Sequence, residues 1–303
     1  MALALSTSWN AYRHTQARQM LFEIKELGFE QVELSFNLTA SMVDESVSAL
    51  RELGMSAVSL HNYCPIPEGF PRKEALPDCY SLSSLNEEER AMAVKFTKRT
   101  IDTASSLAAK AVVLHCGRVE IADKTRELIA LFDQGKKDSP QFRALQESFC
   151  SERSRNSAPY LDKVIDSLGQ LSSYAADKGV SLGVENRFYF REIPSFEEAG
   201  IILQKFKGRN VFYWHDTGHA RVMQNLGFFP GCDFLGEYSA QLLGVHLHNI
   251  KGCSDHQSPT EGEIDFKGLK PYIKGGALKV IEAHYPANPS QVRQGKTLLE
   301  SVL

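Results

Sequence analysis

Short apolar runs of strand length alternate along the chain with longer segments of helical periodicity, and this alternation constrains the fold most. The predicted strands span residues 2–8, 31–34, 56–61, 110–115, 180–185, 211–216, 243–248 and 278–284. The predicted helices span residues 16–27, 42–53, 86–107, 160–178, 196–206, 266–273 and 290–303. Such an alternation is typical of a (β/α)8 TIM barrel. Because no low-complexity linker divides the chain, we expect a single domain over residues 1–303.

One segment interrupts the alternation. Residues 118–157 are charged and have no sustained period, and their most polar stretch, 151–156, reads SERSRN. A connection of this length is uncommon in a compact domain unless it has structure or a function of its own. We therefore expect a helical excursion above the mouth of the barrel, which closes over the substrate as a lid.

The last four predicted strands each end in a carboxylate or an imidazole. These terminal residues are Glu185, Asp216, His248 and Glu282. Alternate residues of a barrel strand point inward, and the position of the large aliphatic residues places all four side chains on the inward face. Three carboxylates that converge at one mouth repel each other unless a cation or protons neutralise them. The pattern predicts a divalent metal site that suits Mn²⁺, Mg²⁺, Co²⁺ or Zn²⁺; the alternative is four buried residues that are paired separately.

The same alternation separates two further histidines from this set. His215 points outward, so we expect it to be packed or hydrogen-bonded behind the barrel. His246 shares the inward face with His248 but comes two residues earlier, so we expect it to support the site from a layer below.

A second group of polar residues ends or follows other predicted strands. Its members are His61, His115, His219, Asp255 and His256. Because His219 comes three residues after Asp216, one helical turn brings both side chains to one ion. Taken singly, each of the five is explained equally well as a residue that supports a ligand or lies at the surface. Together they suffice for a second or third metal, or for contacts to the substrate.

The charge balance limits the class of partner. The chain has 34 Lys and Arg residues against 37 Asp and Glu residues, so it lacks the positive excess of a dedicated nucleic-acid-binding protein. The six cysteines are scattered without a C-x-x-C pair, which favours reduced thiols. No signal peptide and no apolar run of about 20 residues is apparent. We expect a cytoplasmic protein with a small-molecule partner and no membrane or nucleic-acid partner.

Several short motifs follow one another through the strand ends. They read LHNY at 60–63, VVLHCG at 112–117, LGVEN at 182–186, HDTGHA at 215–220, GVHLHN at 244–249, DHQSPTEGEIDF at 255–266 and VIEAH at 280–284. In this order they resemble the xylose isomerase-like TIM-barrel superfamily, which includes sugar and sugar phosphate isomerases and epimerases and endonuclease IV. The resemblance covers nearly the whole chain and implies a homo-oligomer such as a dimer or tetramer.

The resemblance also implies roles for single residues. The predicted ligands Glu185, Asp216, His248 and Glu282 match the single-metal site of the epimerases, where the two glutamates also exchange a proton on opposite faces of the substrate. Other residues match further ligands in the three-metal site of endonuclease IV, namely His61, His115, His219 and His256. That pattern has an aspartate two residues before the last histidine, whereas here the position is Ser254 and Asp255 is shifted by one. The DNA-intercalating loops of that enzyme are not recognisable.

We therefore predict a metal-dependent isomerase or epimerase of a sugar, sugar acid or sugar phosphate. The metal polarises a carbonyl, and Glu185 or Glu282 removes the neighbouring proton while the other returns it, by way of an enediolate. Lys251 and His219 are expected to bind substrate oxygens. Arg118 and Arg187 each follow a strand end, where they either hold a carboxylate or phosphate or, as is more common for arginine, lie solvated at the surface. One alternative is a multi-metal phosphodiesterase of the endonuclease IV kind. A sugar-binding barrel without activity is a third, against which the four intact ligands argue.

Overall fold

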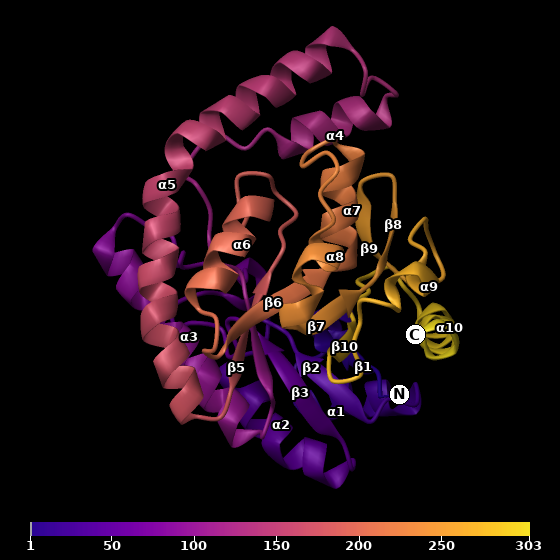
Figure 1. The fold of residues 1–303 in the computed structure, drawn as a ribbon. Coiled ribbons are helices and arrows are strands. Elements are labelled where there is room, and N and C mark those ends of the chain that lie inside the picture. Colours follow the sequence, from indigo (N-terminus) through magenta and orange to yellow (C-terminus); the bar gives the residue numbers. More distant parts are fainter. Residues whose placement is uncertain (1) are drawn as a thin grey trace.

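Eight parallel strands close into a barrel in the order β1-β10-β7-β6-β5-β4-β3-β2 (Figure 1). This computed structural model describes residues 2–303. The barrel strands are β1 (Ala4–Ser6), β2 (Gln31–Leu34), β3 (Ser56–His61), β4 (Ala111–Leu114), β5 (Ser181–Glu185), β6 (Val211–Asp216), β7 (Leu242–Leu247) and β10 (Leu278–Ile281). The prediction of a TIM barrel is confirmed. The first and last residues of every barrel strand lie within three residues of the predicted bounds.

Helices follow the strands and cover the outside of the barrel (Figure 1). They are α1 (Ala17–Glu26), α2 (Ala40–Glu52), α3 (Glu87–Ser106), α4 (Thr125–Asp133), α5 (Pro140–Asp177), α6 (Phe196–Lys205), α7 (Thr217–Asn225), α8 (Phe234–Tyr238), α9 (Phe266–Leu269) and α10 (Pro289–Val302). Side-chain caps explain several of their starts: Ser195 and Glu198 form a capping box at α6, and Asn86 caps α3. The helices α7 and α8 were not predicted.

The lower interior of the barrel is filled by side chains, of which Trp214 is the largest and is fully buried. Its neighbours on the adjacent strands are Gly183 and Gly244. A Cβ atom at Gly183 would lie 2.9 Å from the nearest indole atom, and a Cβ atom at Gly244 would lie 2.4 Å from it. Glycine is therefore required at both positions for the ring to pack against β5 and β7. The barrel is a packed core under the site and not a pore.

The segment 118–157 is helical, as predicted, and consists of α4 and the first part of α5. The predicted helix 160–178 is not separate, because α5 runs without interruption from Pro140 to Asp177. Pro159 lies inside α5 and has no N–H to donate, and Figure 1 shows that α5 bends partway along its length. Arg153 ties this part of α5 to the barrel by donating to Phe190 O at 2.7 Å and to Glu198 Oε2 at 2.6 Å.

A small antiparallel hairpin, β8 (Asn249–Lys251) and β9 (Ser254–Gln257), follows β7 and was also not predicted. The six cysteines are all free thiols. Within residues 2–303, no helix combines the length and the apolar character that a membrane crossing requires.

Candidate functional site

His246 on β7 lies at the centre of a fully buried group of carboxylates. We call this group the buried cluster; it comprises Glu33, Glu185, Asp216, His246 and Glu282. The Nδ1 atom of His246 lies 2.6 Å from Glu185 Oε1 and 3.0 Å from Glu282 Oε2, and its Nε2 lies 3.1 Å from both Glu33 oxygens. Burial lowers the pKa of His246, but the fields of Glu282, Glu33 and Glu185 outweigh it and raise the pKa well above its usual value. His246 is therefore an imidazolium that holds carboxylates from below, as predicted.

The buried cluster carries more negative charge than its own cations neutralise. Four carboxylates face His246 and Arg187, whose Nη1 lies 2.5 Å from Glu185 Oε2 and whose Nε lies 3.4 Å from Glu192 Oε2. Burial lowers the pKa of His248, but Asp216 beside it outweighs this effect and raises the pKa to about 9. Burial raises the pKa values of Glu185 and Glu282, but His246 holds both well below their usual range, so both are ionised. The negative charge that these groups leave unneutralised suits a cation. One oxygen each of Glu185, Asp216 and Glu282 lies within 4.8 Å of the others, so these donors fit a metal ion.

His248 follows the end of β7 and lies beside Asp216, away from the centre of the buried cluster. Its Nε2 is 2.8 Å from Asp216 Oδ2, and its Nδ1 accepts a hydrogen bond from the backbone N–H of His256 at 2.8 Å. A Cβ atom at Gly218 would lie 2.1 Å from His248 Cε1, so the glycine of the HDTGHA motif makes room for this ring. Of the four predicted ligands, three converge on one point, and His248 adjoins them through Asp216.

Asp216 is held by groups that the sequence analysis did not identify. Its Oδ1 accepts the backbone N–H of His219 at 2.7 Å, which makes Asp216 the N-cap of α7. The Asn186 side chain holds the Asp216 backbone on both sides, accepting from its N–H at 2.8 Å and donating to its carbonyl at 3.0 Å. Tyr213 donates to Asn186 at 3.0 Å, and its hydroxyl lies 2.7 Å from His215 Nδ1. His215 is thus buried and hydrogen-bonded behind the barrel, as predicted, and burial lowers its pKa to about 4.

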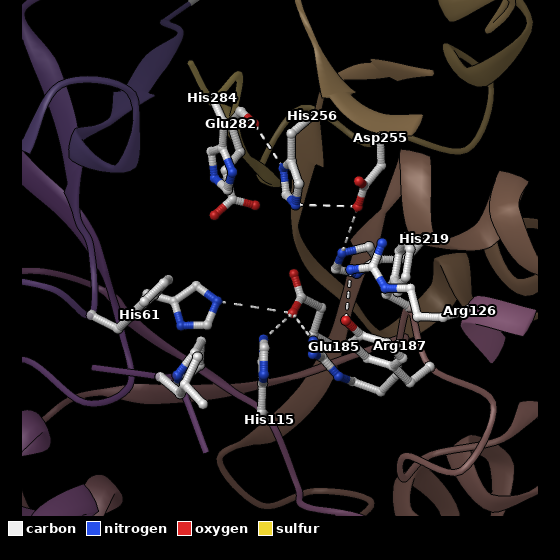
Figure 2. A pocket seen from close by; sticks show the side chains of 15 residues that line it. His61, His115, Arg126, Glu185, Arg187, His219, Asp255, His256, Glu282 and His284 are labelled. Carbon is white, nitrogen blue, oxygen red and sulfur yellow. Dashed lines mark hydrogen bonds and ion pairs between the residues drawn. The ribbon is translucent and has the colours of Figure 1, made fainter. Parts of the chain in front are cut away.

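A second group lies nearer the mouth. We call it the rim cluster; it comprises His219, Asp255 and His256 (Figure 2). His219 donates through Nδ1 to Asn186 O at 3.1 Å, and His256 donates through Nδ1 to Glu282 O at 3.0 Å. Both rings therefore present a free Nε2 atom, at 3.7 Å and 3.4 Å from Asp255 Oδ2. Asp255 thus reaches this site, although it stands one position later in the sequence than the aspartate of the endonuclease IV pattern. His256 has a left-handed backbone with φ of 53°, which sets the direction of its side chain.

His61 and His115 approach the site from β3 and the end of β4. His115 Nε2 lies 3.0 Å and His61 Nε2 lies 3.9 Å from Glu185 Oε2 (Figure 2). Burial lowers the pKa of His115 well below its usual value, so the ring is neutral. One ligand atom each of His61, His115 and Glu185 lies within 4.8 Å of the others. All five residues of the predicted second group thus adjoin the site.

A cavity of about 330 Å³ opens above these residues. Its walls include residues that the sequence analysis missed, among them Phe36, Leu76, Pro77, Arg126, Phe188 and Tyr189. Lys251, which we predicted to bind substrate, does not line this cavity. The hairpin turns it to the exposed surface, where its ammonium pairs with Glu261 at 2.9 Å, so we leave it out of the site. Arg187 does line the cavity.

Comparisons with known proteins agree with this architecture. The model of a family described as xylose isomerase-like TIM barrel matches residues 21–301. Solved structures of 3-keto-D-glucoside 4-epimerase from E. coli and of a D-tagatose 3-epimerase-like protein superpose with TM-scores of 0.69 and 0.70, each at 19% identity. These alignments cover 99% of both chains in the first case, and 100% of this chain and 97% of the other in the second. D-psicose 3-epimerase from Clostridium cellulolyticum H10 superposes with a TM-score of 0.66 at 13% identity, covering 100% of this chain and 99% of the other.

One curated relative also matches. It is an uncharacterized protein of Methanocaldococcus jannaschii, 25% identical over 187 residues, which make up 61% of this chain and 53% of that protein. The match thus spans about half the length of this relative.

Proposed function

The chain belongs to the xylose isomerase-like TIM-barrel family, and we propose that it is a divalent-metal-dependent isomerase or epimerase of a sugar or sugar phosphate. One observation carries the proposal: two ionised carboxylates, Glu185 and Glu282, line the same small cavity and approach the same His246 nitrogen from different strands. Two carboxylates in one enclosed site suit the removal and return of a proton. The epimerases that share the fold support the same reaction class.

The residues that would hold the metal are Glu185, Asp216, Glu282 and His248. His246 is not among them, because both of its ring nitrogens donate to carboxylates. When bound, the metal polarises a substrate carbonyl and its neighbouring hydroxyl and so lowers the pKa of the C–H bond between them.

The two glutamates differ in how they are held. Glu185 is contacted by His246, His115 and Arg187, whereas the donor closest to the Glu282 carboxylate is His246. Each additional donor stabilises the ionised form and makes a carboxylate a weaker base. Glu282 is therefore the stronger base of the two and removes the proton. In an epimerisation Glu185 first takes up a proton from water at the cavity and delivers it to the opposite face of the substrate, which restores its carboxylate, while the proton on Glu282 is released to water.

His219 and Arg187 contact substrate oxygens in this proposal. His219 has an Nε2 that forms no hydrogen bond, and Arg187 lines the cavity beside Glu185. The apolar wall formed by Phe36 and Leu76 limits access of water to the site once a sugar occupies it.

The test is solvent exchange. The metal-loaded protein is incubated in D₂O with a panel of ketoses, ketose phosphates and keto sugar acids, and deuterium uptake next to the carbonyl is followed by NMR. Uptake that disappears when the metal is chelated supports the proposal. The proposal is wrong if the folded, metal-loaded protein causes no deuterium uptake into any sugar of the panel.

One observation favours a second candidate function. The groups His61, His115, Glu185 and His219, Asp255, His256 flank the central site and bring imidazole and carboxylate donors together, as a multi-metal phosphodiesterase requires. The net charge of −3 argues against nucleic acid as the substrate. Cleavage of duplex DNA containing an abasic site, lost in His61→Ala and His115→Ala, would establish this alternative.

A further inference from the structure

Arg126 is the one cavity-lining cation, among the residues that the structure describes, with no carboxylate partner within 4.0 Å. It comes from the first turn of α4, in the helical excursion predicted over residues 118–157. The other arginines near the mouth are neutralised: Arg118 pairs with Asp78 and Glu120, and Arg187 pairs with Glu185 and Glu192. Arg126 therefore brings an uncompensated positive charge to the cavity wall.

The side chain of Arg126 is held in place by aromatic groups. Its guanidinium carbon lies 5.1 Å from the ring centre of Phe188 and 5.3 Å from that of Tyr189, and its Nη2 donates to the Tyr189 hydroxyl at 2.7 Å. A guanidinium has five N–H donors, and this hydrogen bond uses only one of them. Figure 2 shows the Arg126 head group beside His219, at the edge of the ring of polar side chains.

The backbone that carries Arg126 is also fixed. Thr125 is buried, and its hydroxyl accepts the backbone N–H of Phe190 at 3.2 Å. Leu128 is fully buried in an apolar cluster with Phe190 and Phe228. The start of α4 is thus joined to the loop after β5, which carries Arg187, Phe188 and Tyr189. Arg126 is a preorganised group, which lowers the entropy cost of binding a ligand.

An apolar part of the cavity lining has a different character. Phe36, Leu76 and Pro77 offer no cation to the cavity. Any negative charge on a ligand is therefore favoured beside Arg126, and the carboxylates of Glu185 and Glu282, which also line the cavity, repel it.

We propose that the substrate is an anionic sugar, whose carboxylate or phosphate group is bound by Arg126 while the reacting carbon lies over Glu185 and Glu282. This inference rests on the proposed function and narrows its substrate class. Arg126 and the Tyr189 hydroxyl provide donors for the oxyanion, in the way that guanidinium groups commonly bind carboxylates and phosphates. The reacting carbon and the charged group of the substrate are then bound in different parts of the cavity.

The first arm of the experiment measures solvent exchange by the metal-loaded protein with D-fructose, 5-keto-D-gluconate and D-fructose 6-phosphate. We expect kcat/KM at least about tenfold higher for one of the two anionic substrates than for D-fructose, because a charge-assisted hydrogen bond is worth about a factor of ten or more. Which of the two is preferred distinguishes carboxylate from phosphate. Arg126→Gln should abolish this preference by raising KM for the anionic substrate, and Arg126→Lys should partly restore it.

The matched control is Arg143→Gln. Arg143 is an exposed arginine on α5 of the same excursion and does not line the cavity. If Arg143→Gln lowers the anionic preference as much as Arg126→Gln does, or if D-fructose is exchanged as well as both anionic substrates, the proposal is wrong and the epimerase function stands.

A second arm separates this inference from the proposed function. It measures equilibrium binding of the non-reacting ligands D-sorbitol, D-gluconate and D-sorbitol 6-phosphate to the metal-loaded protein. Binding of an anionic ligand that is at least about tenfold tighter than that of D-sorbitol and is lost in Arg126→Gln supports the anion site, even if no sugar undergoes exchange. Equal binding of all three ligands overturns it.

Discussion

The buried cluster and the rim cluster contain the same residue types but are held in different ways. The His246 and Asp216 side chains are fully buried, whereas those of Asp255 and His256 are 21% and 18% exposed. In the buried cluster every ring nitrogen of His246 contacts a carboxylate. In the rim cluster each histidine uses one nitrogen to bond a backbone carbonyl and leaves the other free. The first arrangement fixes charge, and the second presents ligands.

The difference follows from the elements that carry each cluster. The buried residues project from β2, β5, β6, β7 and the end of β10, where hydrogen-bonded register sets their height; Asp216, for example, is paired with His246. The rim residues come from the first turn of α7 and from the β8–β9 hairpin. Loops and helix ends tolerate substitution better than barrel strands do. Substitutions in the buried cluster should therefore affect catalysis and stability, whereas substitutions in the rim cluster should affect ligand binding.

The largest effect is expected on catalysis. Glu185→Gln and Glu282→Gln each remove a proton acceptor while keeping the side-chain shape, so solvent exchange should fall about a thousandfold. The measurement is the NMR exchange rate with the best substrate of the panel, with circular dichroism as the check on folding. His256→Asn at the rim should reduce the rate far less. An equal loss in the rim variant would break the distinction between the clusters.

The next effect is on stability. His246→Leu leaves Glu33, Glu185 and Glu282 without their shared cation, and unpaired buried charge costs about 3–5 kcal/mol. Urea unfolding of the metal-free protein should show this loss, whereas His256→Leu should change the free energy of unfolding by about 1 kcal/mol or less. Adding Glu33→Gln to His246→Leu should recover part of the loss. A His246→Leu protein as stable as wild type would mean that the carboxylates are not held by this imidazolium.

A third comparison concerns metal content. If the rim cluster contacts substrate, the wild-type protein should hold one equivalent of a divalent ion, and His256→Asn should retain it. Asp216→Asn should lose it, because Asp216 belongs to the buried donors. The measurement is elemental analysis of dialysed protein. More than one equivalent in wild type, with a loss in His256→Asn, would make the rim a metal site and favour the multi-metal phosphodiesterase.

The smallest effect is a pH dependence that belongs to neither cluster. His215 has a folded-state pKa of about 4, below the ordinary value of 6.5, because burial disfavours its charged form. The stability that the neutral His215 ring contributes is therefore fully present above pH 6.5 and is lost as the pH falls toward 4. The free energy of unfolding should fall by about 3 kcal/mol in total over this range. Urea unfolding between pH 7 and 4 should show a shallower loss of stability in His215→Gln than in wild type. Parallel curves would mean that His215 is not held neutral by the fold.

Much of the barrel and of the buried site follows from local patterns. Alternation within single strands was enough to place Glu185 inward and His215 outward, because a strand has a fixed period of two residues. Glu33 shows where this reasoning ends. It is a charged residue in a short apolar strand, but its partner His246 lies 213 residues further along the chain. Contacts over that separation depend on the closure of the whole barrel.

Residues outside the strands were harder to place. The segment 118–157 has no sustained period, so the sequence did not indicate that Arg126 would face the cavity while Arg143 faces solvent. Lys251 was expected near the substrate because it follows a strand end, but the hairpin between β7 and α9 directs it away. The helix α7 went unpredicted because it begins immediately after Asp216, with the ligand itself as its cap.

The packing of Trp214 has a kinetic consequence. Since the indole fills the barrel beneath the buried cluster, the ion of the proposed enzyme would reach the carboxylates from the mouth, through the same cavity that the proposed sugar would occupy. We therefore expect ordered binding, in which the ion binds before the sugar and leaves after it. A saturating, slowly turned-over sugar should protect the ion from a chelator, and the half-time of metal removal should lengthen with sugar concentration. Because Trp214 fills the barrel below the site, a bound sugar would block the path by which the ion leaves.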